Sequence, residues 1–127
     1  MRAIGIFGGT FDPIHYGHLR TAFELLQALD LAELRLVPAD RPPHRAAPLC
    51  DADRRLEMLR AAAAGQPVFV VDDRELRRDG PSYTVTTLRE LRAEAPARPL
   101  CLIVGMDAFL GLPQWHEWRA LVELAHL

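Results

Sequence analysis

Four short, almost uninterrupted hydrophobic runs recur along the chain, and polar, helix-forming sequence separates them. The runs cover residues 2–7, 33–37, 68–71 and 100–104. Continuous apolar runs of this length are typical of parallel strands that helices cover on both faces. The pattern therefore predicts a four-stranded parallel sheet. It excludes a membrane-spanning class, because no run approaches the length of a transmembrane helix.

Between the runs, apolar positions repeat with the spacing of helices that bury one face. The four predicted stripes are Leu19, Ala22, Phe23, Leu26 and Leu29; Leu56, Leu59 and Ala63; Val85, Leu88 and Leu91; and Trp118, Leu121 and Val122. Asp51 is placed to cap the second helix and Gly65 to end it. Alternating strands and helices predict an α/β fold with a Rossmann-like, doubly wound sheet, built as one domain over residues 1–127.

Ligands of such sheets bind beyond the carboxyl ends of the strands. The unusual residues of this chain follow the predicted strands in four loops. These loops hold residues 8–18; Pro38 and residues 42–45; Asp72, Glu75 and residues 82–84; and Gly105, Asp107 and Trp115. Because the carboxyl ends of parallel strands meet at one edge, we expect the four loops to converge on one rim.

Composition narrows the class of protein only slightly. Half of the 127 residues are hydrophobic and a quarter are charged, which is ordinary for a globular protein. The net charge of −2 argues against a general nucleic-acid coat protein. All 15 basic residues are arginine, which we attribute to genomic base composition.

Cysteine use and the N-terminal sequence bear on the compartment. Cys50 and Cys101 lack metal-ligand spacing, and Asp12 and His15 interrupt any signal-peptide pattern. We expect a reduced, cytoplasmic protein without membrane or nucleic-acid partners.

The stretch 8–18, Gly-Gly-Thr-Phe-Asp-Pro-Ile-His-Tyr-Gly-His, indicates a phosphate site. A glycine turn lets the backbone approach an anion, and a helix N-terminus offers unpaired N–H groups and a positive dipole. His15 and His18 add side-chain donors. We expect them to stabilise charge, because no Ser or Cys nucleophile with an obvious base stands beside them. The alternative is a pair of histidines that only cap the helix.

The same eleven residues resemble the nucleotidyltransferases with a His-x-Gly-His signature, and in the longer form the nicotinate-nucleotide adenylyltransferases. The resemblance implies adenylyl transfer from ATP to nicotinate mononucleotide in NAD biosynthesis, giving nicotinate adenine dinucleotide and pyrophosphate. Mg²⁺ would accompany the triphosphate, without a dedicated protein metal site. The resemblance also implies that His15 and His18 are catalytic. The implied ATP-binding residues in this stretch are Gly8, Gly9, Thr10 and Phe11.

Two further segments match this family. Pro-Pro-His-Arg at 42–45 stands where the family often has Pro-Pro-His-Lys, so Arg45 would meet the leaving pyrophosphate, and His44 would be structural. Ser82-Tyr83-Thr84 matches a Ser-Tyr-Thr segment. It implies that Tyr83 and Thr84 hold the nicotinate carboxylate, while Ser82 or Thr84 also caps the following helix.

The last predicted loop supplies the remaining candidates. Gly105 would let ATP approach closely, and Asp107 would accept from ribose hydroxyls; the alternative for Asp107 is a helix N-cap. By resemblance Trp115 would stack on the pyridine ring. Trp118 lies on the helical stripe and is expected in the core. Asp12 with Pro13 is expected to form a structural turn.

The sequence departs from the family pattern in one respect. Members carry another strand and a Ser/Thr-rich segment that ends in Arg, and no such segment occurs here. We therefore expect a truncated domain that lacks the last strand and C-terminal helices, and self-association through an open edge at 100–104.

Four alternatives to this function remain. They are a transferase for another phosphate acceptor such as phosphopantetheine, preference for the nicotinamide substrate, a non-catalytic nucleotide-binding fragment, and a zinc site formed by His15, His18 and His44.

Overall fold

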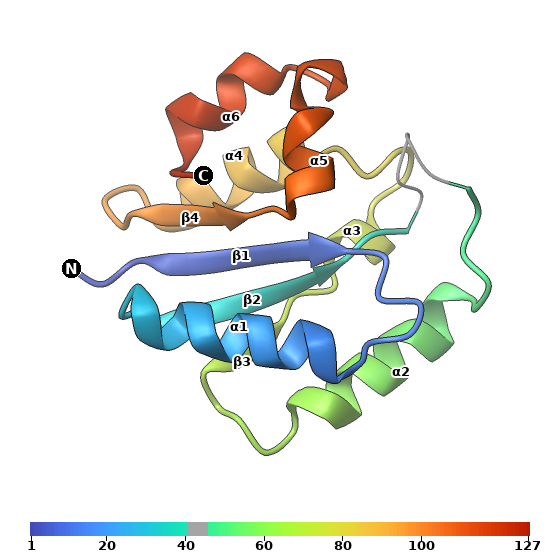
Figure 1. The fold of residues 1–127 in the computed structure, drawn as a ribbon. Helices are drawn as coiled ribbons and strands as arrows, with labels where there is room; N and C mark the ends of the chain where they lie inside the picture. Colours follow the sequence, from blue (N-terminus) through green and yellow to red (C-terminus); the bar gives the residue numbers. More distant parts are fainter. Residues whose placement is uncertain (41–45) are drawn as a thin grey trace.

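The computed structural model describes residues 1–40 and 46–127. Its sheet consists of β1 (Ile4–Gly9), β2 (Glu33–Pro38), β3 (Phe69–Val71) and β4 (Leu100–Ile103). All pairs are parallel, and the strand order is β3-β2-β1-β4 (Figure 1). The four strands predicted from the hydrophobic runs are therefore confirmed.

Helices cover both faces of the sheet, as the alternation predicts. The helices α1 (Tyr16–Ala28) and α2 (Ala52–Ala63) lie on one face. On the other face lie α4 (Thr84–Glu94) and α6 (Trp118–Leu124), and Figure 1 shows them above β4. Three short helices escaped prediction: α3 (Arg74–Arg77), α5 (Met106–Leu110) and the 3₁₀ helix η1 (Leu112–Gln114).

Alternating strand residues divide the core into two layers. Ile4 and Ile6 of β1 pack with Leu88 of α4, while Leu34 and Leu36 of β2 pack with the α1 and α2 side. The strand order reverses between β1 and β4, since the chain builds β1-β2-β3 outward and then returns to the other side of β1. Such a switch point is where a doubly wound sheet opens a crevice for ligands.

The helical stripes are narrower than predicted. Phe23 and Leu29 of the first stripe are 43% and 51% exposed, and Val122 of the last is 55% exposed. Asp51 caps α2 as expected, since its carboxylate accepts from the Arg54 N–H at 2.8 Å. The buried residue of the first turn of α2, however, is Arg55.

The outer edge of β4 is partly paired. The His126 N–H donates to the Leu100 carbonyl at 2.8 Å, and the Leu102 N–H donates to the His126 carbonyl at 2.7 Å. The expectation of a fully open edge at this strand is therefore wrong, because the segment after α6 returns parallel to β4. Within the described part of the chain, no helix is long and apolar enough to cross a membrane.

Candidate active site

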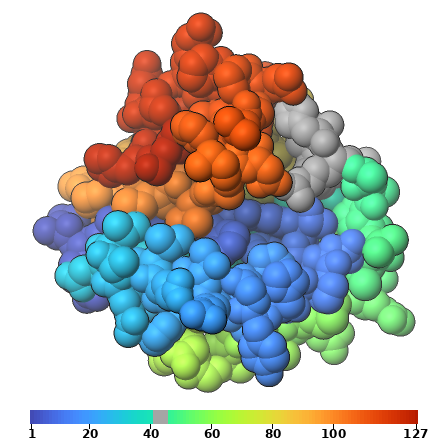
Figure 2. All heavy atoms as spheres, in the orientation of Figure 1, coloured from blue at the N-terminus to red at the C-terminus, as the bar shows by residue number. Residues whose placement is uncertain are grey.

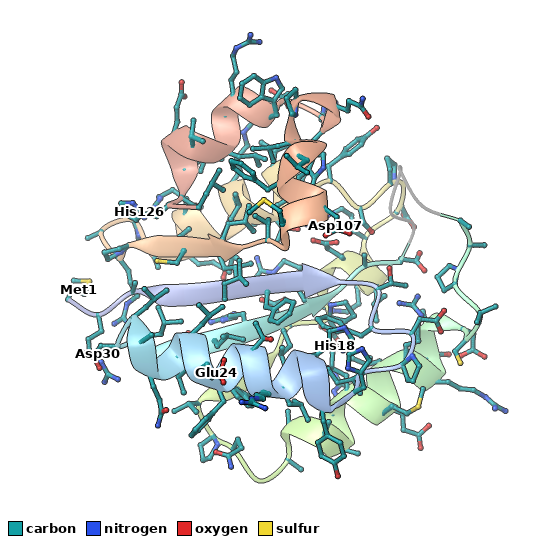
Figure 3. All side chains as sticks on the ribbon, viewed as in Figure 1. Met1, His18, Glu24, Asp30, Asp107 and His126 are labelled. Atoms are coloured by element: carbon teal, nitrogen blue, oxygen red, sulfur yellow. The ribbon has the colours of Figure 1, made fainter. Side chains whose placement is uncertain are left out.

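The rim at the carboxyl ends of the strands carries most of the predicted site residues. Figure 3 shows His18 and Asp107 at this rim, below and above β1, and Met1, Asp30 and His126 at the opposite end of the sheet. In Figure 2 the deep-blue end of β1 reaches the surface between α1 and the orange α5. The rim therefore brings the glycine loop and the residues after β4 to one place.

His15 and His18 form a reciprocal cap at the start of α1. The Nδ1 atom of His15 accepts the Gly17 N–H at 3.1 Å, and Nδ1 of His18 accepts the His15 N–H at 3.2 Å. The two rings stack with centroids 3.8 Å apart. The capping interpretation is thus confirmed, and it leaves the other edge of both rings for a ligand.

This cap determines which donors the helix start can offer. The Gly17 N–H is bound by His15 Nδ1, and the His18 and Leu19 N–H groups donate to the His15 carbonyl. The expectation that these amides are unpaired is therefore wrong. Because each Nδ1 accepts a hydrogen bond, each neutral imidazole carries its proton on Nε2. Two Nε2–H donors and the positive end of the helix dipole remain for an anion.

The environment of His18 favours its neutral form. Its partial burial, followed by the charge of the neighbouring His15, lowers the pKa of His18 below its ordinary value of 6.5. The edges of Phe7 and Phe11 meet the His18 ring, with centroids 6.2 and 5.2 Å away. Neutral His18 is a hydrogen-bond donor without a net charge.

Gly17 is required by the geometry of the cap. A Cβ atom at this position would lie 2.9 Å from Cε1 and 3.0 Å from Nδ1 of His15, closer than packed atoms tolerate. The glycine of the His-x-Gly-His pattern therefore makes room for the first histidine ring.

The glycine loop offers backbone rather than side chains. Gly8 is exposed, Gly9 and Thr10 are half-buried, and the ring of Phe11 is buried at 3% exposure. Phe11 has a left-handed backbone with φ of 50°. The buried ring of Phe11 contacts His18, so only the backbone of Phe11 is left for a ligand.

Asp12 has the structural role that the sequence indicated. Its carboxylate accepts the Leu49 N–H at 2.6 Å and the Cys50 N–H at 2.9 Å. These two backbone hydrogen bonds lower the pKa of Asp12. They tie the loop after β1 to the segment that leads into α2.

Sequence reasoning missed Arg55. Its guanidinium donates to the carbonyls of Thr10, Ala39 and Cys50 beneath the rim. Its position beside the apolar stripe of α2 was the only sequence feature that could have indicated burial, and an arginine at such a position is usually expected to be exposed to solvent.

The Ser82–Thr84 segment lies at the start of α4. The N-cap is Tyr83, which makes no side-chain capping hydrogen bond, so the expected cap by Ser82 or Thr84 is wrong. Ser82 is buried, and its Oγ accepts the Asp40 N–H at 3.1 Å. The Tyr83 ring stacks on His116 at 4.2 Å, a contact that the sequence did not indicate.

The aromatic residues after η1 lie close to this segment. Trp115 and Trp118 are both half-buried against the core that contains α4 and α6. Trp118 is therefore in the core margin, as expected. The Glu117 carboxylate joins the same region to α4 through a two-pronged ion pair with Arg89, at 2.9 and 3.0 Å.

Asp107 is exposed in the first turn of α5, whose N-cap is Gly105. The N-cap alternative for Asp107 is thus wrong, and its carboxylate faces solvent at the rim. Arg45 and His44 lie outside the described residues.

Asp72 and Glu75 do not belong to the rim. Asp72 is buried and bound by Arg35 and Arg74, and Glu75 is buried and accepts from the Thr87 hydroxyl at 2.6 Å. Burial alone would raise the pKa of Asp72, but the hydrogen bonds from the two arginines lower it.

The described residues offer few side-chain ligands for a metal ion. No group of three His, Cys, Asp or Glu side chains that could hold a metal occurs in residues 1–40 and 46–127. At the rim, Asp107 offers one exposed carboxylate. Such a donor set suits a divalent cation that retains several waters and needs few protein ligands.

Comparison with known proteins decides the family. A family model described as cytidylyltransferase-like matches residues 6–127. A curated protein of Aeromonas hydrophila, named "Probable nicotinate-nucleotide adenylyltransferase", is 60% identical over 124 residues, which are 98% of this chain and 58% of that protein. The chain belongs to the cytidylyltransferase-like family. A curated protein of Halorhodospira halophila, with the same name as the Aeromonas protein, is also 60% identical, over 100% of this chain and 58% of its own length.

Solved structures of adenylyltransferases share the fold. Plasmodium falciparum nicotinic acid mononucleotide adenylyltransferase complexed with NaAD matches with a TM-score of 0.83 at 20% identity, over 96% of this chain and 60% of that one. The same enzyme complexed with APC gives a TM-score of 0.78 at 19% identity, with the same coverage. The Rossmann-like fold predicted from the sequence is thereby confirmed. The chain spans about 58% of the length of the curated relatives it matches.

Proposed function

We propose that this chain carries the adenylyl-transfer site of a cytoplasmic enzyme of NAD biosynthesis, with ATP and nicotinate mononucleotide as its substrates. The observation that supports this proposal most directly is the reciprocal His15–His18 cap beside the exposed Gly8, at the switch point between β1 and β4. The family membership supports the same chemistry.

The reaction needs charge stabilisation and positioning. An oxygen of the nicotinate mononucleotide phosphate attacks the α-phosphorus of ATP, and the bond from that phosphorus to the β-phosphate bridging oxygen breaks. The electron pair leaves with pyrophosphate. The Nε2–H groups of His15 and His18 donate to the phosphate oxygens, where negative charge grows in the transition state. A divalent ion such as Mg²⁺, when bound with the triphosphate, would supply further charge neutralisation, and the exposed Asp107 carboxylate is the rim residue that would help to hold it.

The remaining rim residues hold the two substrates. The backbone of Gly8, Gly9, Thr10 and Phe11, together with Gly105, lies against ATP, and Asp107 accepts from its ribose. Arg45 meets the leaving pyrophosphate. Tyr83, Thr84 and Trp115 hold the nicotinate group, its carboxylate at the N-terminus of α4, where the dipole favours an anion.

The carboxylate assignment gives the first test. Calorimetric titration of the 127-residue chain with nicotinate mononucleotide and with nicotinamide mononucleotide should show tighter binding of the nicotinate form. A lost charge-assisted hydrogen bond costs about 1.5–3 kcal/mol, so we expect roughly tenfold or more. Equal affinities would remove the carboxylate site from the start of α4.

A pyrophosphate-release assay on the same chain separates two functions. Turnover would support the transferase. Binding of both ligands without turnover would instead support a non-catalytic nucleotide-binding chain.

A further inference from the structure

A buried arginine joins three loops beneath the rim. Arg55, in the first turn of α2, is 1% exposed. Its Nη1 donates to the Thr10 and Ala39 carbonyls, each at 2.8 Å, and its Nε donates to the Cys50 carbonyl at 3.1 Å. Within the described part of the chain, no carboxylate forms an ion pair with it. Its described partners are therefore backbone carbonyls from the glycine loop, the end of β2 and the segment before α2.

Fixing a carbonyl also fixes the next amide. In a trans peptide the C=O and the following N–H point in opposite directions across one plane. Because the Ala39 carbonyl points to Arg55, the Asp40 N–H points away from it, and this N–H donates to Ser82 Oγ at 3.1 Å. In the same way, the Thr10 carbonyl on Arg55 turns the Phe11 N–H away from α2.

The two peptides that Arg55 orients are connected to segments assigned to different substrates. The Thr10–Phe11 peptide belongs to the loop assigned to ATP, and the Asp40 amide holds the segment 82–84 assigned to nicotinate mononucleotide. We propose that Arg55 is a positioning residue that orients both substrate-binding segments, here called half-sites, at once. The inference rests on the proposed function for its substrates, but not for the geometry of Arg55.

The chemistry of this position calls for arginine. A buried cation is costly unless its donors are satisfied, and a planar guanidinium can reach three carbonyls in fixed directions. Lysine would retain the positive charge but lack the planar group that donates in several fixed directions. Substitution by lysine therefore separates the geometric role from a purely electrostatic attraction for phosphate.

The neighbouring residue provides a matched control. The Arg54 side chain is 79% exposed, and its ion pair with Asp51 is long, at 3.9 Å. We would titrate wild type, Arg55→Lys, Arg55→Gln and Arg54→Gln with a non-hydrolysable ATP analogue and with nicotinate mononucleotide. We expect Arg55→Lys to weaken both ligands about tenfold, the loss typical of a charge-assisted hydrogen bond, and Arg54→Gln to match wild type. Wild-type affinities in Arg55→Lys would overturn the inference.

A fourth variant tests the connection from Arg55 to the segment assigned to nicotinate mononucleotide. Ser82→Ala removes the acceptor of the Asp40 N–H, so it should weaken nicotinate mononucleotide while the ATP analogue binds as in wild type. If Arg55→Gln fails to fold, Arg55→Lys and Ser82→Ala still test the positioning role of Arg55. Equal weakening of both ligands by Ser82→Ala would contradict separate half-sites joined through Arg55.

Amide hydrogen exchange provides a readout without ligand. The Asp40 amide should exchange faster in Arg55→Lys than in wild type or Arg54→Gln, at a temperature where all are folded. Unchanged exchange, even with a lower Tm, would leave Arg55 a purely structural residue and overturn the inference. If wild type binds neither ligand, the proposed function fails for this chain, and the exchange of the Asp40 amide alone decides the role of Arg55.

Discussion

At the residue scale, the histidine pair is organised before any ligand binds. Each Nδ1 atom accepts a backbone N–H, and the rings stack on each other, so rotamer and tautomer are both fixed. Donors that need no reorganisation stabilise developing charge most effectively. The cap is thus part of the proposed mechanism as well as of the helix.

Gly17→Ala should damage this cap. The added Cβ would press on the His15 ring at 2.9 Å and displace it from the Gly17 N–H. Loss of an N-cap costs about 1 kcal/mol, and we expect chemical denaturation to show that loss together with weaker binding of an ATP analogue. Gly65→Ala is the control, because nothing lies within 4 Å of a Cβ there. A Gly17→Ala chain with wild-type stability and affinity would contradict the space requirement.

His18 should give the fold a pH dependence. Its folded pKa is lowered from 6.5, so the unfolded chain binds the proton more tightly. Stability therefore rises with pH between the folded and unfolded pKa values and falls as pH drops through that window. His18→Gln, which retains a capping acceptor at this helix position, should have a flatter profile of unfolding free energy over roughly pH 5 to 7.5. Superimposable profiles would exclude this contribution.

The sequence predicted the histidine pair and missed the residues beneath it for one physical reason. His15 and His18 are three residues apart, so a local motif contains their whole interaction. Arg55 lies 45 residues from Thr10, and its role exists only after α2 packs against the sheet. Local pattern could not reveal it.

At the element scale, α3 and α4 are joined to the sheet by buried charge. Arg35 of β2 binds Asp72 at 3.0 Å, and Arg74 of α3 binds the same carboxylate at 2.8 Å and also Glu94 of α4. Glu75 lies in this network with Thr87 as its donor. The network holds the start of α4, where the nicotinate segment is proposed.

Glu75→Gln should stabilise the fold at neutral pH. Burial is the main cause that raises the pKa of Glu75, while the Thr87 hydrogen bond opposes it. The folded state then holds the proton more tightly than the unfolded chain. Stability therefore falls as pH rises from the unfolded to the folded pKa, and the full cost of burying the charged carboxylate applies above the folded pKa. Glutamine keeps an acceptor for Thr87 without the charge. We expect a higher Tm at pH 7 and a smaller difference near pH 4, measured by calorimetry.

The exposed Glu57→Gln of α2 is the matched control for this variant and should leave Tm unchanged. A lower Tm for Glu75→Gln would mean that the attraction between Glu75 and Arg78 outweighs the burial penalty.

Element prediction succeeded where a hydrophobic pattern was long enough to recognise. The strands coincide with continuous hydrophobic runs, and the helices α1, α2, α4 and α6 each bury a repeated apolar pattern. The helices α3 and α5 span four and five residues, too few for a period to show. In the first turn of α2, the buried side chain is the cation Arg55. The predicted apolar stripe assigned that buried position to Leu56 instead.

At the scale of the whole molecule, strand order places the site. The loops after β1 and β4 converge because these strands are neighbours at the switch point. The sequence supports this through the alternation of strands and helices alone. It could not reveal that the segment after α6 returns to β4, because one residue pair has no pattern of its own.

This return gives a test of the sheet edge. His126→Pro removes the N–H that donates to the Leu100 carbonyl, whereas His126→Ala retains it. An uncovered strand edge tends to pair with another chain. We therefore expect the proline variant to lose about 1 kcal/mol of stability and to scatter more light with increasing concentration. The alanine variant should follow wild type. Equal scattering by all three chains would show that the His126 pairing does not protect β4, and that any self-association of this molecule uses another surface.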